Sequence, residues 1–168
     1  MLTIRAATAQ DAETIHRFIV ELAIYEKEPD AVEVSPAELA AQLREERPPF
    51  EALVAEATLD GQRAPVGFAL YFHNYSTWRG RHGLYLEDLY VTPAARGRGY
   101  GKALLARLAA VAVDRGCARM EWSVLDWNTP AIAFYESLGA TPMSEWTTFR
   151  LTNEALTAMA AEGGDPTR

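Results

Sequence analysis

Two acidic residues and a glycine-rich loop stand close together in the middle of the chain, where they could bind a cation and an anion side by side. Glu87 and Asp88 lie within the apolar run LEDLYV, and the segment RGRGYGK follows at residues 96–102. A carboxylate can hold a cationic group or take a proton from it. Glycines allow tight turns and a close approach of the backbone to a ligand. A helix that starts here offers unpaired N–H groups, so the segment predicts a cradle for an anion such as a pyrophosphate.

The spacing of the glycines separates this loop from two common nucleotide-binding motifs. A P-loop needs glycine at position 96 and Ser or Thr after Lys102, whereas the chain has Arg96 and Ala103. A dinucleotide-binding fingerprint needs G-x-G-x-x-G, whereas the glycines here are evenly spaced and several strands precede them. Taken alone, the loop is equally consistent with a structural turn that binds nothing.

The charge balance narrows the class of partner. Sixteen Lys and Arg stand against 23 Asp and Glu in 168 residues, which gives a formal net charge of −7. This balance is unfavourable for binding a nucleic-acid backbone and favours a cationic partner. We therefore expect no nucleic-acid function.

Cysteine content and hydropathy indicate the cellular compartment that we expect for the protein. Cys117 is the only cysteine, so the chain forms no intramolecular disulfide, and a reducing cytoplasm is the simplest expectation. The opening residues MLTIRAATAQDAE lack the apolar run of a secretory signal. No stretch approaches the ~20 apolar residues of a membrane span, so we expect a soluble protein without membrane partners.

The hydrophobic periodicity predicts the elements that must position the loop and the acids. Short strands are expected before and after two early helices, the second of which opens with the capping box Ser35-Pro36-Ala37-Glu38. A hairpin is expected around Asp60-Gly61. In order, we predict strand 2–6, helix 15–23, helix 36–46, strands 50–57, 65–75 and 84–91, helix 102–115, strand 117–124, helix 130–138, strand 149–151 and helix 153–161.

The run R-x-x-G-x-G from Arg96 to Gly101, after a strand that closes in Val91, resembles the acetyl-CoA signature of the GNAT superfamily of N-acetyltransferases. Segments 75–78, 85–91 and 125–128 further resemble the diamine acetyltransferases. Within these enzymes, they resemble the thialysine branch more than the spermidine/spermine branch. The resemblance implies an α/β (α+β) fold with a mixed, mostly antiparallel central sheet flanked by helices. The length of 168 residues fits one domain, which we expect over residues 1–161, with 162–168 as a flexible tail.

The resemblance implies acetyl-CoA as co-substrate and assigns residues to it. The strand backbone would hold the pantetheine, the loop the pyrophosphate, and a later segment the rest of the coenzyme. Tyr135 would lie near the sulfur, where a phenol with a pKa near ~10 can protonate a departing thiolate as general acid. The cofactor-binding residues implied are Leu89, Tyr90, Val91, Arg96, Gly97, Arg98, Gly99, Tyr100, Gly101, Lys102, Asn128, Thr129, Pro130 and Ala131.

The acceptor side follows from the chemistry of an amine. An alkylammonium with a pKa near ~10.4 must lose a proton before it attacks a thioester, and Glu87 is the predicted base, acting through water. Asp88, expected on the other face of the strand, has a binding or a structural role. The resemblance places Tyr25 and Glu26 at the far end of the amine, and Trp78 as a wall of the acceptor site.

Some alternatives stay open. The thioester is already activated, so direct transfer in a ternary complex needs no metal, and His16, His73 and His82 show no ligand spacing. The acceptor is expected to be a small cationic amine, with thialysine, lysine-like amines and polyamines all open. A peptide, protein or aminoglycoside-type acceptor, or a non-catalytic acetyl-CoA sensor, is the alternative. The resemblance also suggests a homodimer.

Overall fold

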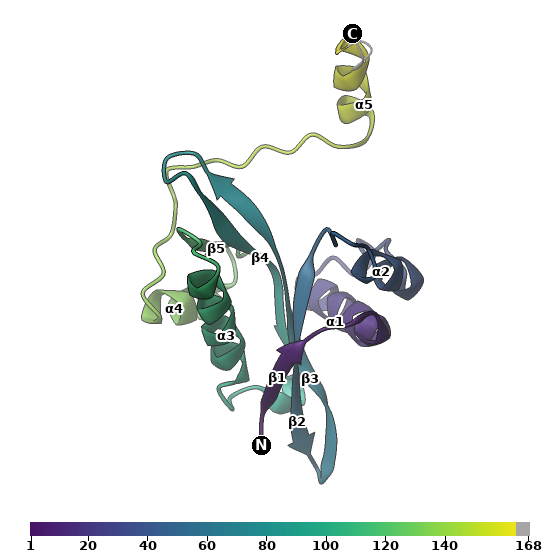
Figure 1. Cartoon of the computed structure of the whole chain (residues 1–168), viewed down its shortest axis with the longest axis vertical. Helices are drawn as coiled ribbons and strands as arrows, with labels where there is room; N and C mark the ends of the chain where they lie inside the picture. Colours follow the sequence, from purple (N-terminus) through teal and green to yellow (C-terminus); the bar gives the residue numbers. More distant parts are fainter. Residues whose placement is uncertain (164–168) are drawn as a thin grey trace. The chain divides into compact units, whose positions relative to one another are not determined.

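The computed structural model describes residues 1–163, and the chain divides into two compact units that meet in sequence between Leu125 and Asp126. The first unit holds a five-stranded sheet with helices beside it (Figure 1). The second unit consists of the segments that follow the last strand of that sheet. The predicted single domain over residues 1–161 stays a prediction.

The sheet of the first unit is mixed and mostly antiparallel, as predicted. Its strands lie in the order β1 (Thr3–Ala6), β2 (Glu51–Leu59), β3 (Gln62–Ser76), β4 (Arg81–Val91) and β5 (Met120–Trp122). The first four pair antiparallel, and β5 runs parallel to β4. Chain order and sheet order therefore coincide.

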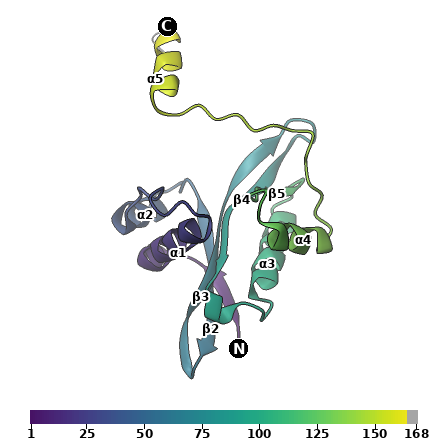
Figure 2. The same ribbon diagram turned by 180° about the vertical axis from the view of Figure 1, so that it is seen from behind.

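Helices cover both faces of this sheet, which confirms the fold class. The helices α1 (Ala12–Tyr25) and α2 (Pro36–Leu43) lie on one face, and α3 (Tyr100–Asp114) lies on the other (Figures 1 and 2). Phe18 of α1 is fully buried and stacks on Phe68 of β3, with ring centroids 5.6 Å apart. Burial of such aromatic surface is the main contribution that holds α1 on the sheet.

Two local signals of the sequence are confirmed at the start of α2 and at the hairpin. The hydroxyl of Ser35 accepts a hydrogen bond from the Glu38 N–H at 3.2 Å, and the Glu38 carboxylate accepts one from the Ser35 N–H at 2.8 Å. Asp60 and Gly61 have φ of 49° and 80°, the left-handed conformation that a tight hairpin turn needs. Both features depend on local backbone hydrogen bonds or dihedral angles, so they can be predicted from the sequence without knowledge of tertiary contacts.

The second unit contains α4 (Thr129–Ser137) and α5 (Asn153–Glu162), both close to their predicted bounds. The predicted strand 149–151 is wrong, because the segment from 140 to 152 forms neither helix nor strand. Phe149 is 92% exposed there. A strand requires a hydrogen-bonded neighbour, and the described residues supply none for this segment. Of the predicted tail, residues 164–168 lie outside the described residues.

Candidate active site

A β-bulge in β4 sets the directions of the two central acids. Leu70 of β3 pairs with Asp88, but the next residue, Tyr71, pairs with Leu86, so Glu87 is the extra residue in β4. Leu70 packs in the core formed with α1, and directly paired residues share a face, so Asp88 lies on the α1 side of the sheet. The regular alternation expected between Glu87 and Asp88 is interrupted at this point.

One edge of β4 lies open beyond the bulge. The parallel pairing between β4 and β5 runs from Leu84 with Met120 to Leu86 with Trp122 and ends there, whereas β4 continues to Val91. Among the described residues, the segment 87–91 therefore pairs with β3 alone. An extended ligand that carries amides can hydrogen-bond to such an edge as a strand would. This segment contains Leu89, Tyr90 and Val91, the residues predicted to hold the pantetheine.

The glycine loop leads directly into α3 and leaves the start of that helix open. Gly97 and Gly99 have φ of 75° and 79°, which explains why glycine stands at both positions. A Cβ added at either would meet no atom within 4 Å, so no other group packs directly against the loop at these two positions. Gly99 is the N-cap of α3 and no side chain caps the helix, which leaves its first N–H groups available to an anion.

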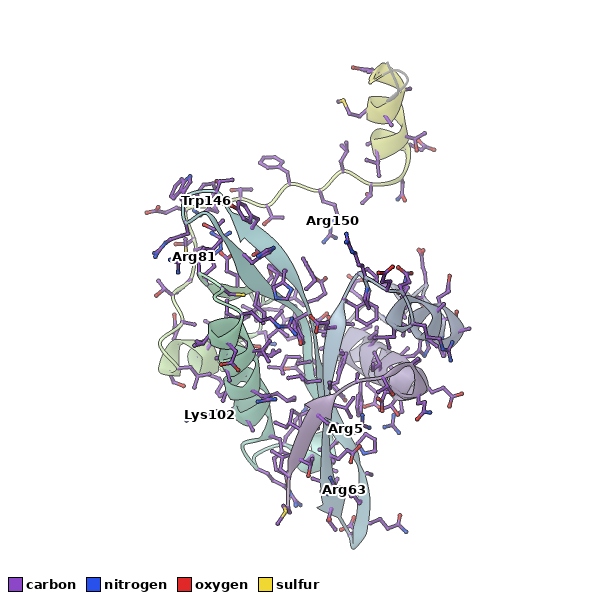
Figure 3. All side chains as sticks on the ribbon, viewed as in Figure 1. Arg5, Arg63, Arg81, Lys102, Trp146 and Arg150 are labelled. Carbon is purple, nitrogen blue, oxygen red and sulfur yellow. The ribbon has the colours of Figure 1, made fainter. Side chains whose placement is uncertain are left out.

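Cations surround this helix start. Arg98 and Lys102 are both exposed, and Lys102 lies in the first turn of α3 (Figure 3). Tyr100 is half-buried at the first helical position. The predicted pyrophosphate residues of the loop therefore come together in one place, with positive charge and free N–H groups.

The side chain of Arg96 is held by protein groups, a feature that the sequence did not predict. Its Nε donates a hydrogen bond to the Val91 carbonyl at 2.9 Å. Its guanidinium lies over the rings of Tyr25 and Tyr90, 5.2 Å and 5.5 Å from their centroids. Burial raises the pKa of Tyr90, and a hydrogen bond to Glu21 adds to that shift.

Two of the three predicted substrate-binding acids, Glu26 and Glu87, act electrostatically on the third, Asp88. Burial raises the pKa of Asp88 from 3.8 to about 6, and the negative charges of Glu87 and Glu26 add to the shift. Partial burial also raises the pKa of Glu26, a solvent-exposed residue that caps the C-terminal end of α1. Among residues 1–163, no cationic group offsets the shift of Asp88. The site therefore concentrates negative charge without neutralising it.

Gly67 of β3 supports this end of β4 and was missed by the sequence analysis. A Cβ at this position would lie 2.5 Å from the Tyr90 carbonyl oxygen, a distance that real Cβ contacts do not reach. Glycine is therefore required for β3 to approach β4 beside the site. An isolated glycine within a strand pattern is the signal that could have indicated it.

The structure does not bring every predicted residue to this site. Trp78 lies in the turn between β3 and β4 and is 88% exposed. At about 3.4 Å per residue, this turn lies roughly 20 Å along β4 from the bulge at Glu87. Within one chain, Trp78 is therefore remote from the acids that it was predicted to accompany.

The remaining predicted residues belong to α4 of the second unit. Asn128 is the N-cap of α4, and Thr129, Pro130 and Ala131 form its first turn. Tyr135 lies near the helix end, with its ring centroid 5.5 Å from that of Phe134. The contacts predicted between these residues and the coenzyme stay predictions.

Residues 1–163 lack the features of two other kinds of site. They contain no group of three or more His, Cys, Asp or Glu side chains that could hold a metal ion. They also contain no helix long and apolar enough to cross a membrane.

Comparison with known proteins identifies the family. The sequence pattern of the Acetyltransferase (GNAT) family matches residues 16–140. The thialysine N-epsilon-acetyltransferase of Bos taurus is 42% identical over 167 residues, with 95% of this chain and 97% of that protein covered. The spermidine/spermine N(1)-acetyltransferase-like protein 1 of Homo sapiens is 40% identical over 167 residues, with 95% of this chain and 24% of that protein covered.

The solved structure of an integron cassette protein, VCH_CASS6, from V. cholerae has the same fold. The TM-score is 0.76 at 26% sequence identity, with 95% of this chain and 97% of that chain covered. Fold and sequence together define an acyltransferase, and the chain belongs to the acetyltransferase (GNAT) family. Within that family it is similar to the thialysine and spermidine/spermine acetyltransferases, as its motifs predict.

Proposed function

We propose that this acyltransferase uses acetyl-CoA to acetylate the primary amine of a small cationic metabolite. One observation carries the proposal: β4 bears the uncompensated acids Glu87 and Asp88 and leads, through the glycine loop, into the open N-terminus of α3. One strand thus connects a cation-binding region with an anion-binding region. This order suits an amine next to a phosphate-bearing acetyl donor.

The coenzyme fits the residues present. The N–H groups at the start of α3 and the exposed Arg98 and Lys102 would hold its pyrophosphate. The open edge of β4 from Leu89 to Val91 would pair with its pantetheine amides. When bound, acetyl-CoA supplies an activated thioester, so transfer needs only a neutral amine held in line with it.

The acids prepare the amine. The negative charges of Glu26, Glu87 and Asp88 attract an ammonium group into the site. The bound ammonium then neutralises part of that negative charge. A base works best when its pKa lies near the operating pH, and Asp88 meets that condition with a pKa raised to about 6. Because Glu87 and Asp88 interact, we assign proton removal to the pair, with Glu87 relaying through water.

Tyr135 is proposed as the acid that protonates the departing thiolate. The proposal rests on its position seven residues after Asn128, which matches the family pattern, and on its phenol, which can donate a proton. We expect Tyr135→Phe to lower kcat about 10- to 100-fold while the dissociation constant for acetyl-CoA changes less than about twofold. Stopped-flow turnover and isothermal titration of the coenzyme measure the two quantities. Unchanged kcat would remove Tyr135 from the acid role.

The acceptor is expected to carry two charges. One relative reported above is named a thialysine acetyltransferase, and another is named for its likeness to the spermidine/spermine acetyltransferases. We propose that Glu87 and Asp88 bind the reacting amine and that Tyr25 and Glu26 bind the far end of the molecule. The negative charges of Glu26, Glu87 and Asp88, in a protein of net charge −7, favour dications over monoamines.

We also propose a homodimer in a cytoplasmic setting. Among residues 1–163, the segment 140–152 pairs with no strand, and it exposes large apolar side chains, with Met143 60% and Phe149 92% exposed. Surfaces of this kind commonly mark interaction sites. A second chain is also the simplest way for Trp78 to approach an acceptor site. Sedimentation at several concentrations tests the association.

Acetyl-CoA-dependent thiol release tests the proposed function. The acceptors are thialysine, lysine, ornithine, putrescine, spermidine and a peptide amine, each against a blank without amine. Turnover confined to the small amines supports the proposal, whereas turnover of the peptide alone indicates a protein acetyltransferase. An aminoglycoside added to the panel covers that alternative. Tight coenzyme binding without turnover of any acceptor indicates a sensor.

A further inference from the structure

Arg96, the first residue of the glycine motif, directs its side chain to protein groups and not toward the start of α3, where a phosphate would bind. Arg96 donates from Nε to the Val91 carbonyl at 2.9 Å, so its side chain folds back onto the end of β4. From there its guanidinium lies over two aromatic rings, 5.2 Å from the centroid of Tyr25 and 5.5 Å from that of Tyr90. These distances lie within the range of favourable cation–π attraction.

The two rings belong to different elements. Tyr90 is on β4, is only 6% exposed, and its ring centroid lies 5.9 Å from that of the buried Phe18. Tyr25 is the last residue of α1 and is 40% exposed. Arg96 thus connects a buried ring on the sheet with an exposed ring at the end of α1.

We propose that Arg96 is a positioning residue that ties the end of α1 to the end of β4, and that it does not act as a ligand of the coenzyme phosphates. Arg98 and Lys102 leave the loop with cations for that task. The inference rests on the proposed function in one respect: Tyr25 and Glu26 line the acceptor site.

The consequence concerns Glu26. This residue follows Tyr25 directly and its charge acts on Asp88, so the position of the α1 end decides how close the two carboxylates lie. The chain turns sharply just beyond, where Lys27 has φ of 66°. Loss of the Arg96 contact would let this end move and would weaken amine binding without removing an acid.

Steady-state kinetics of Arg96→Gln and Arg96→Lys test the proposal, with Arg107→Gln on the exposed face of α3 as matched control. Exposed cation–π contacts are weak, so we expect KM for the amine to rise about three- to tenfold in Arg96→Gln, with kcat within about twofold of wild type. Arg96→Lys keeps the cation and should recover part of the loss. The control should match wild type.

Acetylpantetheine, which carries no phosphate, separates positioning from phosphate binding. If Arg96 positions α1, Arg96→Gln lowers kcat/KM by the same factor with acetylpantetheine and with acetyl-CoA. If Arg96 binds phosphate, the loss appears with acetyl-CoA alone, and the KM of acetyl-CoA, not that of the amine, rises. That second pattern overturns the proposal.

A readout without substrate completes the test. Hydrogen exchange of the peptide that covers residues 20–28 should be faster in Arg96→Gln than in Arg107→Gln or wild type, because the α1 end loses its anchor. In a Tyr25→Leu background, Arg96→Gln should cause no further increase. Equal exchange in all variants overturns the proposal even if the wild type acetylates none of the amines, an outcome that would refute only the proposed function.

Discussion

Acidic side chains gather at two places in the first unit, and the two clusters differ in what surrounds them. One cluster joins β1 to the turn before α1 and contains Asp11 and Glu56. The other lies at the β4 bulge and contains Glu87, Asp88 and Glu26. The first is neutralised by arginines, and the second is not.

The first cluster is a fully paired network. Arg5 donates to both oxygens of Asp11, at 2.9 Å and 2.7 Å, and its Nε donates to Glu56 at 2.8 Å. Arg63 reaches the second oxygen of Glu56 at 3.2 Å (Figure 3). The hydrogen bond from Arg5 holds the pKa of Asp11 below its usual value, and backbone Thr8 contributes. Through the side chain of Arg5, these two carboxylates link β1 to β2 and to the turn before α1.

The second cluster shows the opposite electrostatics. Burial and like charge hold the pKa of Asp88 near 6, so ionisation of this group in the free protein is unfavourable. A structure gains no stability from such an arrangement by itself. The difference indicates that the paired acids stabilise the fold, whereas the unpaired acids form a binding site for a cationic ligand.

The largest effect is expected when the unpaired cluster loses its charge. The double substitution Glu87→Gln with Asp88→Asn should lower kcat about 100- to 1000-fold at pH 7, because no base remains to take the proton of the amine. With acceptor turnover as the measurement, Asp11→Asn is the control, and its folded form should keep wild-type kcat. Activity within about threefold of wild type in the double variant would contradict the assignment.

The pH profile sharpens the same prediction. The base acts when ionised, so kcat/KM of the wild type should rise with pH through about 6, the pKa of Asp88. Asp88→Asn alone should remove or displace this limb. A limb that is unchanged in Asp88→Asn and absent in Glu87→Gln would move the role to Glu87.

The paired cluster should respond in stability instead of activity. Asp11→Asn leaves Arg5 with weaker partners and removes a carboxylate that also accepts from Thr8 at 2.8 Å. We expect the free energy of unfolding at pH 7 to fall by about 2–3 kcal/mol in urea denaturation. Glu45→Gln, at an exposed position after α2, is the matched control. A loss below about 0.5 kcal/mol would mean that the network contributes little.

Much of the fold and part of the site could be predicted from the sequence, because local chemistry determines them. The capping box at Ser35 and the open loop at Gly97 and Gly99 depend on backbone conformations that few residues adopt. The bulge at Glu87 depends on the pairing register of β3 with β4, and no local sequence pattern predicts that register. The contact of Arg96 with Tyr25 joins residues far apart in sequence, and the missing strand at 149–151 depends on a neighbour that the described chain lacks.

Stability should depend on pH in opposite directions at the two clusters. The folded pKa of Asp88 lies above its unfolded value, so the folded state holds the proton more tightly, and stability falls as pH rises from about 4 to about 6. Asp88→Asn should therefore stabilise the protein by about 2 kcal/mol at pH 7 and hardly at all below pH 4. Asp11, whose pKa is lowered, contributes stability that is present above its unfolded value and is lost as pH falls through its folded value. Urea denaturation between pH 3 and 8 distinguishes the two slopes.

The smallest effect is expected at Glu26, at the far edge of the unpaired cluster. Glu26→Gln removes one exposed charge, so KM for a diamine should rise about three- to fivefold, while KM for a monoamine of similar length changes less than about 1.5-fold. Glu28→Gln, two residues further on and exposed, is the matched control. Higher ionic strength should reduce the difference, because an exposed charge is screened. Equal changes for diamine and monoamine would show that Glu26 does not bind the second charge, and the unpaired cluster would then serve only the reacting nitrogen.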